Sequence, residues 1–325
     1  MHNSLIPLLR ALSDGKFHSG AQLAERFGIS RATVCNALKA AEPAGVSLHK
    51  IPGRGYRLPA APEWLAAAEI RTLLQGYGTE FSVEIVDRID STNAALMGSP
   101  GAPHRHCLAA EIQYAGRGRR GRIWHSTLGG SLTCSVRWRF DQGIAALAGL
   151  SLATGVAVIR TLREFDIDSV QLKWPNDVLW QQRKLAGILI EVQGEANGPS
   201  IAVIGIGINL RLSPHSRAGI DQSVADLAEI TEAPIGRNRL LAALLFHLNA
   251  VMTEFERHGL NHLRHEWLIA HAHADKTVRI AMASGNDLIG RITGLAQNGA
   301  LLLRTDDDKQ IAVNSGEVQL ARVLT

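Results

Sequence analysis

The chain has 325 residues, of which 46% are hydrophobic and 20% charged, and its formal net charge is +4. This composition is typical of a folded protein with two or three domains and excludes a disordered chain. No apolar run approaches the roughly 18 residues that a membrane span needs, and the N-terminus lacks the pattern of a signal peptide. We therefore expect a cytoplasmic protein without a membrane partner.

Cysteine content limits the possible functions further. The three cysteines, Cys35, Cys107 and Cys134, are odd in number and widely separated. They fit neither a disulfide framework nor a C-x-x-C metal site. We therefore predict no metal-ligating residues in this chain.

Positive charge is concentrated near the N-terminus. Residues 1–60 hold eight Lys or Arg but only three Asp or Glu, so the remainder of the chain is nearly neutral. A small basic module on a neutral body is typical of a protein that binds a polyanion such as DNA. A well-solvated small domain with no such partner is the alternative.

The order of elements in this segment is that of a winged helix-turn-helix. We predict a first helix, a short helix over residues 21–27, a turn at Gly28 and a recognition helix over residues 31–42. Pro43 makes continuation of this last helix unlikely. Because short patterns of this kind also arise by chance, the wing that follows them is important.

The wing is predicted from a hairpin. Strands over residues 46–51 and 56–58 flank a turn that carries Arg54 at its tip. A basic wing next to a helix-turn-helix favours DNA binding by a domain over residues 1–62. Residues 59–62, Pro-Ala-Ala-Pro, form a natural linker to the rest of the chain.

The central region, residues 63–271, mixes strands and helices. Several strands follow one another as hairpins, which favours an α+β domain with a mixed sheet over a regular βαβ series. Strands are predicted at residues 82–88, 107–113, 131–139, 170–174, 177–180, 186–193 and 201–210, and helices at residues 93–97, 143–165 and 237–258.

The last region, residues 272–325, is predicted to be a small β-barrel. Short apolar runs alternate there with turn residues, and no helical period is visible. The strands are expected at residues 278–282, 288–295, 300–304 and 310–313, with turns at residues 284–287 and 306–308.

A glycine–arginine loop is the sharpest motif. Gly116, Gly118 and Gly121 match the dinucleotide pattern G-x-G-x-x-G. We reject that interpretation because residues 123–130 do not open a helix, which a pyrophosphate site requires. The intervening positions instead hold four guanidinium groups, which predict a clamp for a phosphate. These residues are Arg117, Arg119, Arg120 and Arg122.

Four further clusters place polar residues or glycines beside apolar segments. Lys173-Trp174-Pro175-Asn176-Asp177 and Lys184–Glu191 each place a lysine at the mouth of a strand, where it can meet an anionic ligand. Gly205-Ile206-Gly207-Ile208-Asn209 has glycines that indicate either close approach to a ligand or a bulge. Ser91-Thr92-Asn93 is either a helix cap or a set of donors and acceptors for a neutral polar ligand.

Taken together and in this order, these motifs resemble the biotin–protein ligases, above all the bifunctional members that are also repressors of biotin synthesis. The resemblance covers nearly the whole chain. It implies a class II synthetase-like catalytic domain with a mixed sheet and an SH3-like C-terminal barrel.

The resemblance also implies a two-step reaction. Biotin and ATP, with Mg²⁺, form biotinyl-5′-AMP, and the biotinyl group then passes to a lysine of the biotin carboxyl carrier protein of acetyl-CoA carboxylase. Lys184, Arg119 and Asp177 are the implied catalytic residues: Lys184 bridges carboxylate and phosphate, Arg119 retains the intermediate and Asp177 helps to deprotonate the incoming amine. The implied ligand-binding residues are Ser91, Thr92, Asn93, Gln113, Gly116, Arg117, Gly118, Arg119, Arg120, Arg122, Trp124, Lys173, Asn176, Lys184, Gly187, Gly207 and Asn209.

In addition, the resemblance implies operator DNA as a partner and a homodimer promoted by the bound intermediate. One departure concerns a tryptophan that covers adenine in the repressor-type relatives. None of the six tryptophans falls within residues 211–235, and Val224 lies near the expected place. We expect a smaller apolar cover there.

Three alternatives stay open. The same fold and adenylate chemistry serve lipoate–protein ligases, although these lack the arginine-rich loop. A second alternative is a regulator that only senses a small molecule, but Lys184 and Arg119 favour an active enzyme. The third is an enzyme whose N-terminal domain is a vestigial packing element, an interpretation that the basic wing tip Arg54 disfavours.

Overall fold

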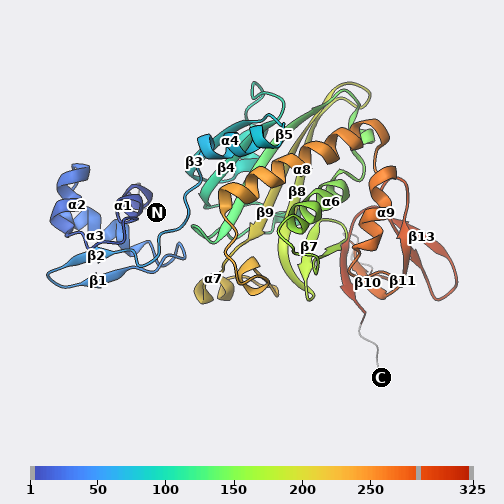
Figure 1. The fold of residues 1–325 in the computed structure, drawn as a ribbon. Coiled ribbons are helices and arrows are strands. Elements are labelled where there is room, and N and C mark those ends of the chain that lie inside the picture. The colour runs from blue at the N-terminus through green and yellow to red at the C-terminus, as the bar shows by residue number, and fades with distance from the viewer. Residues whose placement is uncertain (1–3, 283–286, 322–325) are drawn as a thin grey trace.

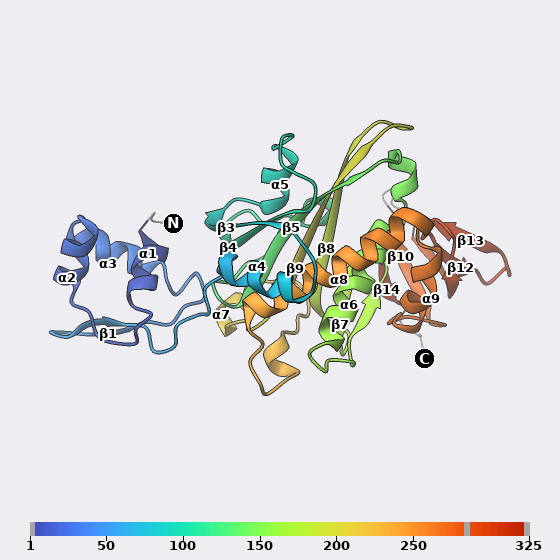
Figure 2. The same ribbon diagram turned by 45° about the horizontal axis from the view of Figure 1, so that its top comes forward.

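The computed structural model describes residues 4–282 and 287–321, and its elements form three groups in chain order (Figure 1). Figures 1 and 2 both show the N-terminal module at one end, the C-terminal sheet at the other and a large sheet between them. The whole is an α+β structure, as the sequence predicts.

The N-terminal module is a winged helix-turn-helix, and local sequence explains its boundaries. Ser19 and Gln22 form a capping box at the start of the second helix, and Gly28 ends that helix in the left-handed conformation, with φ of 61°. The third helix ends at Lys39, earlier than the predicted residue 42. The elements are α1 (Leu5–Ala11), α2 (Gly20–Phe27), α3 (Arg31–Lys39), β1 (His49–Ile51) and β2 (Gly55–Arg57).

The central sheet has seven strands in the order β3-β4-β5-β9-β8-β7-β6. Only the pair β3–β4 is parallel, so the predicted mixed sheet is confirmed. Polar residues that follow the carboxyl ends of β3 and β4 therefore lie side by side. The strands are β3 (Ser82–Ile89), β4 (His106–Gln113), β5 (Ser131–Phe140), β6 (Gln171–Lys173), β7 (Asp177–Trp180), β8 (Arg183–Gly194) and β9 (Ser200–Asn209).

Helices cover both faces of this sheet. Helices α4, α6 and α8 lie together over one face in Figures 1 and 2. On the opposite face, Leu96 of α5 packs against Leu108 and Val203. The sequence prediction missed α4, α7 and α9. The helices of this region are α4 (Ala67–Gly76), α5 (Thr92–Met97), α6 (Leu150–Arg163), α7 (Pro214–Ala218), α8 (Arg237–His258) and α9 (Asn261–Ile269).

One helix prediction was wrong in its extent. Residues 143–165 do not form a single helix: a short 3₁₀ turn, Ile144–Leu147, comes first, and α6 begins only at Leu150. Gly149 separates them with φ of 86°, a left-handed conformation that breaks the helical path.

The C-terminal region is a five-stranded antiparallel sheet in the order β13-β12-β11-β10-β14. The last strand, β14, was not predicted. Residues 284–286 of the predicted turn lie outside the described residues. The strands are β10 (Thr277–Ala281), β11 (Leu288–Leu295), β12 (Leu301–Arg304), β13 (Gln310–Val313) and β14 (Glu317–Leu320).

The N-terminal module is packed directly against the central sheet. Ile112 of β4 and Leu128 belong to the hydrophobic core of that module. In addition, Arg10 of α1 forms an ion pair with Asp87 of β3 at 2.9 Å. Both Ile112 and Leu128 flank the glycine–arginine loop, so this loop begins and ends close to where the N-terminal module packs on the central sheet.

Within the ranges that the structure describes, no helix is both long and apolar enough to cross a membrane.

Candidate active site

The predicted motifs converge on one cavity. Residues from the glycine–arginine loop, from the starts of β7 and β8, from the middle of β5 and β9, and from α5 all line it. Six of its lining residues are cationic and two are acidic, so it favours an anionic ligand. The charged lining residues are Arg117, Arg119, Arg120, Arg122, Lys173, Lys184, Asp177 and Glu317.

The glycine–arginine loop is a small hairpin folded over this cavity. The Gly118 N–H donates to the carbonyl of Arg122 at 2.7 Å, and the Trp124 N–H donates to the carbonyl of Gly116 at 2.8 Å. A Cβ at Gly116 would stand 2.4 Å from the Trp124 carbonyl oxygen, so the close pairing requires glycine there. No α-helix follows the loop, in agreement with the rejection of a dinucleotide site.

Two of the loop arginines are held by carboxylates. Arg117 Nη2 lies 2.8 Å from Glu191 Oε1 of β8. Arg122 forms an ion pair with Glu317 of β14, and this hydrogen bond raises the pKa of Arg122 and lowers the pKa of Glu317. The loop is therefore fastened both to the central sheet and to the C-terminal sheet.

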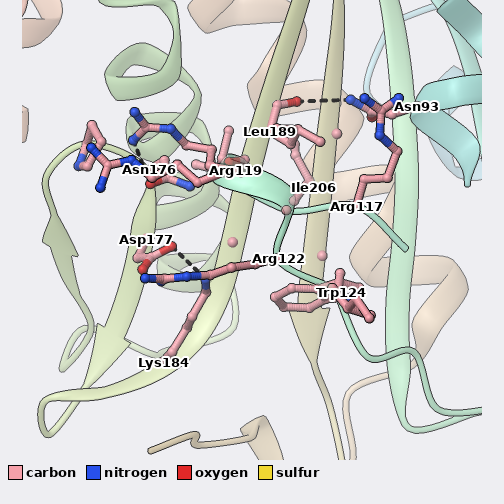
Figure 3. A pocket seen from close by; sticks show the side chains of 18 of the residues that line it. Asn93, Arg117, Arg119, Arg122, Trp124, Asn176, Asp177, Lys184, Leu189 and Ile206 are labelled. Atoms are coloured by element: carbon pink, nitrogen blue, oxygen red, sulfur yellow. Dashed lines mark hydrogen bonds and ion pairs between the residues drawn. The ribbon is translucent and has the colours of Figure 1, made fainter. Parts of the chain in front are cut away.

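The other two arginines contact neutral oxygens. Arg119 Nη1 donates to Asn176 Oδ1 at 3.2 Å, and Arg120 Nη1 donates to the carbonyl of Ala281 at 3.4 Å. Burial, and then the neighbouring charge of Arg120, lowers the pKa of Arg119. Figure 3 shows Arg119 beside Asn176. Among the described residues no carboxylate pairs with Arg119, so its charge is available to bind an anion.

Lys184 and Asp177 form an ion pair between the starts of β8 and β7. Lys184 Nζ lies 2.8 Å from Asp177 Oδ1, as Figure 3 shows. The backbone of Lys184 is fixed on both sides, since its N–H donates to the carbonyl of Ser223 and its carbonyl accepts from Asn209 Nδ2. Its ammonium group is thus presented to the cavity from a rigid strand end.

Lys173 is the second lysine of the cavity and lies at the end of β6. Burial lowers its pKa, although the nearby Asp177 and Glu317 oppose this shift. The adjacent Trp174 is buried, and its Nε1 donates to the carbonyl of Gly299 at 3.0 Å. This end of the cavity therefore rests on the C-terminal sheet.

The other end of the cavity is polar but nearly uncharged. Gln113 Oε1 accepts from the N–H of Thr92 at 2.7 Å and from its hydroxyl at 3.0 Å. The Ser135 hydroxyl lies 2.7 Å from Thr92 Oγ1 and donates to Asn93 Oδ1 at 2.5 Å. The Ser91 side chain caps α5 by accepting from the N–H of Ala94. Such a floor suits a neutral ligand that needs hydrogen bonds.

Glycines of β8 and β9 make room for protein side chains. Gly187 and Gly207 are partners in the ladder, and a Cβ at Gly207 would stand 2.3 Å from Trp124 Cε2. A Cβ at Gly205 would stand 2.2 Å from Asn93 Oδ1. The pairing of β8 with β9 has no shift in register, so these glycines do not mark a bulge. They leave space for other atoms to approach the backbone, among them the side chains of Trp124 and Asn93.

Most of the predicted ligand-binding residues line this cavity, but two do not. Gly116 shapes the loop, and Asn209 is buried behind Lys184, where it donates to the carbonyls of Lys184 and Ala225. Asn209 therefore acts on the cavity through the backbone. Val224 is also buried and is bridged to Lys184, while Gln222 is the residue of that segment which reaches the cavity.

Sequence reasoning missed Ser135, Gln222, Glu191 and Glu317. Ser135 is one polar residue in an otherwise unremarkable strand, and Glu317 lies in a strand that was not predicted. The sequence did point to Glu191, since it ends the Lys184–Glu191 motif. Its ion pair with Arg117, however, depends on how the glycine–arginine loop and β8 are placed relative to each other.

The fold and the cavity together define a class of protein that binds a small ligand. The cavity has a neutral polar floor and a cationic mouth, so it suits a ligand with one neutral polar end and one anionic end. Comparison with known proteins agrees along the chain. Family models match residues 5–57 (HTH domain), residues 85–209 (Biotin/lipoate A/B protein ligase family) and residues 273–321 (Biotin protein ligase C terminal domain).

The chain is 37% identical over 309 residues to the bifunctional ligase/repressor BirA of Salmonella typhimurium, covering 94% of this chain and 95% of that protein. It is 32% identical over 257 residues to the biotin–[acetyl-CoA-carboxylase] ligase of Mycobacterium tuberculosis, covering 77% of this chain and 93% of that protein. The structure of biotin protein ligase from Aquifex aeolicus in complex with biotin and ATP matches with a TM-score of 0.63 and 26% identity, covering 74% of this chain and 99% of that one. The chain therefore belongs to the biotin protein ligase family.

Proposed function

We propose that this protein activates biotin with ATP to biotinyl-5′-AMP, transfers biotin to a lysine of the biotin carboxyl carrier protein of acetyl-CoA carboxylase, and represses biotin synthesis genes. The observation that carries the proposal is the cavity with a neutral hydrogen-bonding floor and a cationic mouth. Biotin has the complementary charge distribution, since its ring is neutral and its reacting end is a carboxylate.

The floor supports a role in holding the ring. Thr92, Asn93 and Gln113 offer both donors and acceptors, and Ser135 keeps Thr92 and Asn93 in register. We assign the ring to these residues and to Ser91. Their hydrogen bonds to one another are the ones that a ligand would partly replace.

The mouth supports a role in adenylation. When the biotin carboxylate attacks the α-phosphate, negative charge develops on the phosphoryl oxygens, and fixed cations stabilise it. Lys184 and Arg119 are placed for this role, with Lys173 behind them. Lys184 is held by Asp177 at 2.8 Å. Once Lys184 turns to the phosphate, Asp177 is free to accept the proton of the carrier's lysine amine.

Mg²⁺ fits this site only as a companion of ATP. Both acidic residues that line the cavity, Asp177 and Glu317, are ion-paired with basic residues. Among the described residues, no group of three or more His, Cys, Asp or Glu could hold a metal. We therefore propose that Mg²⁺ enters bound to phosphate oxygens, where it would neutralise their charge.

The N-terminal module supports the repressor function. Its recognition helix α3 and its wing β1–β2 lie at the far end of the molecule from the C-terminal sheet (Figure 1). Arg54 at the wing tip lies over the ring of Phe17 at 4.4 Å.

We propose domains over residues 1–62, 63–271 and 272–325. A homodimer promoted by biotinyl-AMP would place two modules on two half-sites of operator DNA. ATP consumption and DNA binding both suit a cytoplasmic protein.

Incubation with biotin, ATP, Mg²⁺ and an apo carrier domain tests the ligase. We expect biotin on the carrier lysine and no labelling of the carrier when lipoate replaces biotin. A lipoylated carrier would support the lipoate ligase, and no labelling with either acid would support a regulator that only senses a small molecule.

Sedimentation and a gel shift on DNA upstream of biotin-synthesis genes test the repressor. Biotin with ATP should tighten dimerisation and DNA binding together, by about 5- to 150-fold for a typical coupling energy. The shift should weaken steeply with salt, and Arg54→Ala should reduce it. If ligand changes neither the mass distribution nor the shift, the N-terminal domain is vestigial and only the ligase remains.

A further inference from the structure

Glu191 is an acidic residue beside the cavity that does not line it. The two oxygens of its carboxylate contact side chains from two different segments. Oε1 lies 2.8 Å from Arg117 of the loop, and Oε2 accepts from Asn93 Nδ2 of α5 at 3.0 Å. One carboxylate on β8 therefore joins the covering loop to the floor of the site. Figure 3 shows Arg117 and Asn93 side by side at this end of the cavity.

The Asn93 side chain has almost no freedom once Glu191 is in place. Its Nδ2 also donates to the carbonyl of Leu189 at 3.3 Å, and its Oδ1 accepts from Ser135. It is only 4% exposed, and the missing side chain of Gly205 leaves the space that it occupies. Among the residues that the structure describes, Glu191 is thus the charged partner of a buried amide that belongs to the ligand floor.

Arg117 differs from Arg119 in how its charge is used. Its guanidinium is compensated by Glu191, whereas Arg119 has only the neutral oxygen of Asn176. Both arginines belong to the same hairpin, in which the Gly118 N–H is bonded to Arg122. Fixing Arg117 therefore also fixes the start of the hairpin from which Arg119 extends.

We propose that Glu191 is a positioning residue for biotin, which acts by holding Arg117 and Asn93 in one arrangement so that loop and floor form a single binding surface. This inference rests on the proposed function. Because Glu191 does not reach the cavity, its effect passes through these two partners. It should affect the binding of biotin more than that of ATP, since both of its partners, Asn93 and Arg117, lie at the end of the cavity assigned to the ring.

The test is Glu191→Gln in the full-length protein, assayed by pyrophosphate release with biotin and ATP varied separately. The amide can still bond to Asn93 but cannot pair with the charge of Arg117. We expect the KM for biotin to rise about 5- to 20-fold, the range for loss of a partly exposed charged contact, while the KM for ATP changes less than twofold. Glu195→Gln, an exposed carboxylate four residues along, is the matched control and should leave both constants unchanged.

A double-mutant cycle with Arg117→Gln separates positioning from general damage. If Glu191 acts through Arg117, the double variant should have the same biotin KM as Arg117→Gln alone. Additive losses, or equal effects on biotin and ATP, would overturn the proposal. Should Glu191→Gln unfold at assay temperature, Arg117→Gln breaks the same pair from the exposed side and must raise the KM for biotin at least as much. A wild-type protein that releases no pyrophosphate with biotin refutes the proposed function instead.

Discussion

The indole ring of Trp124 lies directly on Gly207, so closely that a Cβ at position 207 would stand 2.3 Å from Trp124 Cε2. Gly187, the ladder partner of Gly207, leaves the same space from the neighbouring strand. Trp124 follows the glycine–arginine hairpin, so the position of its ring is set by two glycines that lie about 60 to 80 residues away in sequence. This contact joins the loop to the sheet without a charge.

Gly207→Ala should therefore displace Trp124. Its Cβ meets the rigid ring at a distance that real contacts do not allow, so the ring and the end of the hairpin must move. We expect biotin-dependent pyrophosphate release to fall by roughly 5- to 150-fold, since overpacking typically costs about 1–3 kcal/mol. Gly219→Ala is the control, because its Cβ would meet nothing nearer than 3.7 Å. Equal activity of the two variants would show that the Trp124 position does not matter.

Lys184→Ala should nearly abolish adenylation and leave the fold intact. Loss of one charge-assisted contact to developing negative charge costs about 2.7–4 kcal/mol, or roughly 100- to 1000-fold in rate. Pyrophosphate release measures the loss, and the thermal midpoint checks the fold. Lys276→Ala removes an exposed lysine outside the cavity and serves as the control. A Lys184→Ala rate within threefold of the wild-type rate would remove Lys184 from the catalytic residues.

Arg119→Gly should release the intermediate early. Arg119 and Arg120 both contact neutral oxygens among the described residues, but only Arg119 reaches Asn176 in the wall of the cavity, so we expect it to retain the phosphate. Biotinyl-AMP that escapes will acylate lysines of unrelated proteins, and biotin on added albumin reports the leak. Arg120→Gly, next in the same turn, should leak less, because Arg120 donates to the carbonyl of Ala281. If albumin is labelled no more than by the wild-type protein, Arg119 does not retain the intermediate.

His271 should make the protein sensitive to mild acid. It is 5% exposed, its ring packs against that of Trp267 at a tilt of 43°, and neither ring nitrogen has a hydrogen-bond partner among the described residues. Burial, followed by the charge of His273, lowers the pKa of His271 to about 3. As the pH falls, this histidine is therefore protonated in the unfolded chain before it is protonated in the folded one. Its contribution to the free energy of unfolding is fully present above pH 6.5 and is lost as the pH falls toward 3.

His271→Phe removes this proton-linked loss and keeps an aromatic ring packed against Trp267. The free energy of unfolding should then fall less between pH 7 and pH 5, by a difference on the order of 2 kcal/mol. His273 keeps part of the pH dependence, because burial also lowers its pKa, to about 4. His215→Phe, at an exposed position, should leave the profile as in the wild-type protein. Parallel profiles for wild type and His271→Phe would contradict the assignment.

The sequence by itself determined the order of the three groups of elements, most strands of the central sheet and the residues of the catalytic motifs. It could do so because strand periodicity, glycine turns and clustered arginines are local properties. Gly28 ends α2 as its conformational freedom predicts, and Lys184 opens β8 at the mouth of the cavity. Gly149 shows the limit of such reasoning, because a single left-handed residue divided a helix that composition alone predicted to be continuous.

Only the tertiary structure decided which charges of the glycine–arginine loop are free. Sequence makes the four arginines equivalent, but β8 brings Glu191 to Arg117, β14 brings Glu317 to Arg122, and Arg119 is left with Asn176. These pairings depend on strand register and on the packing of the C-terminal sheet against the central one. An ion pair is set by distances of a few ångströms between side chains that lie up to 195 residues apart, and no local pattern encodes such distances.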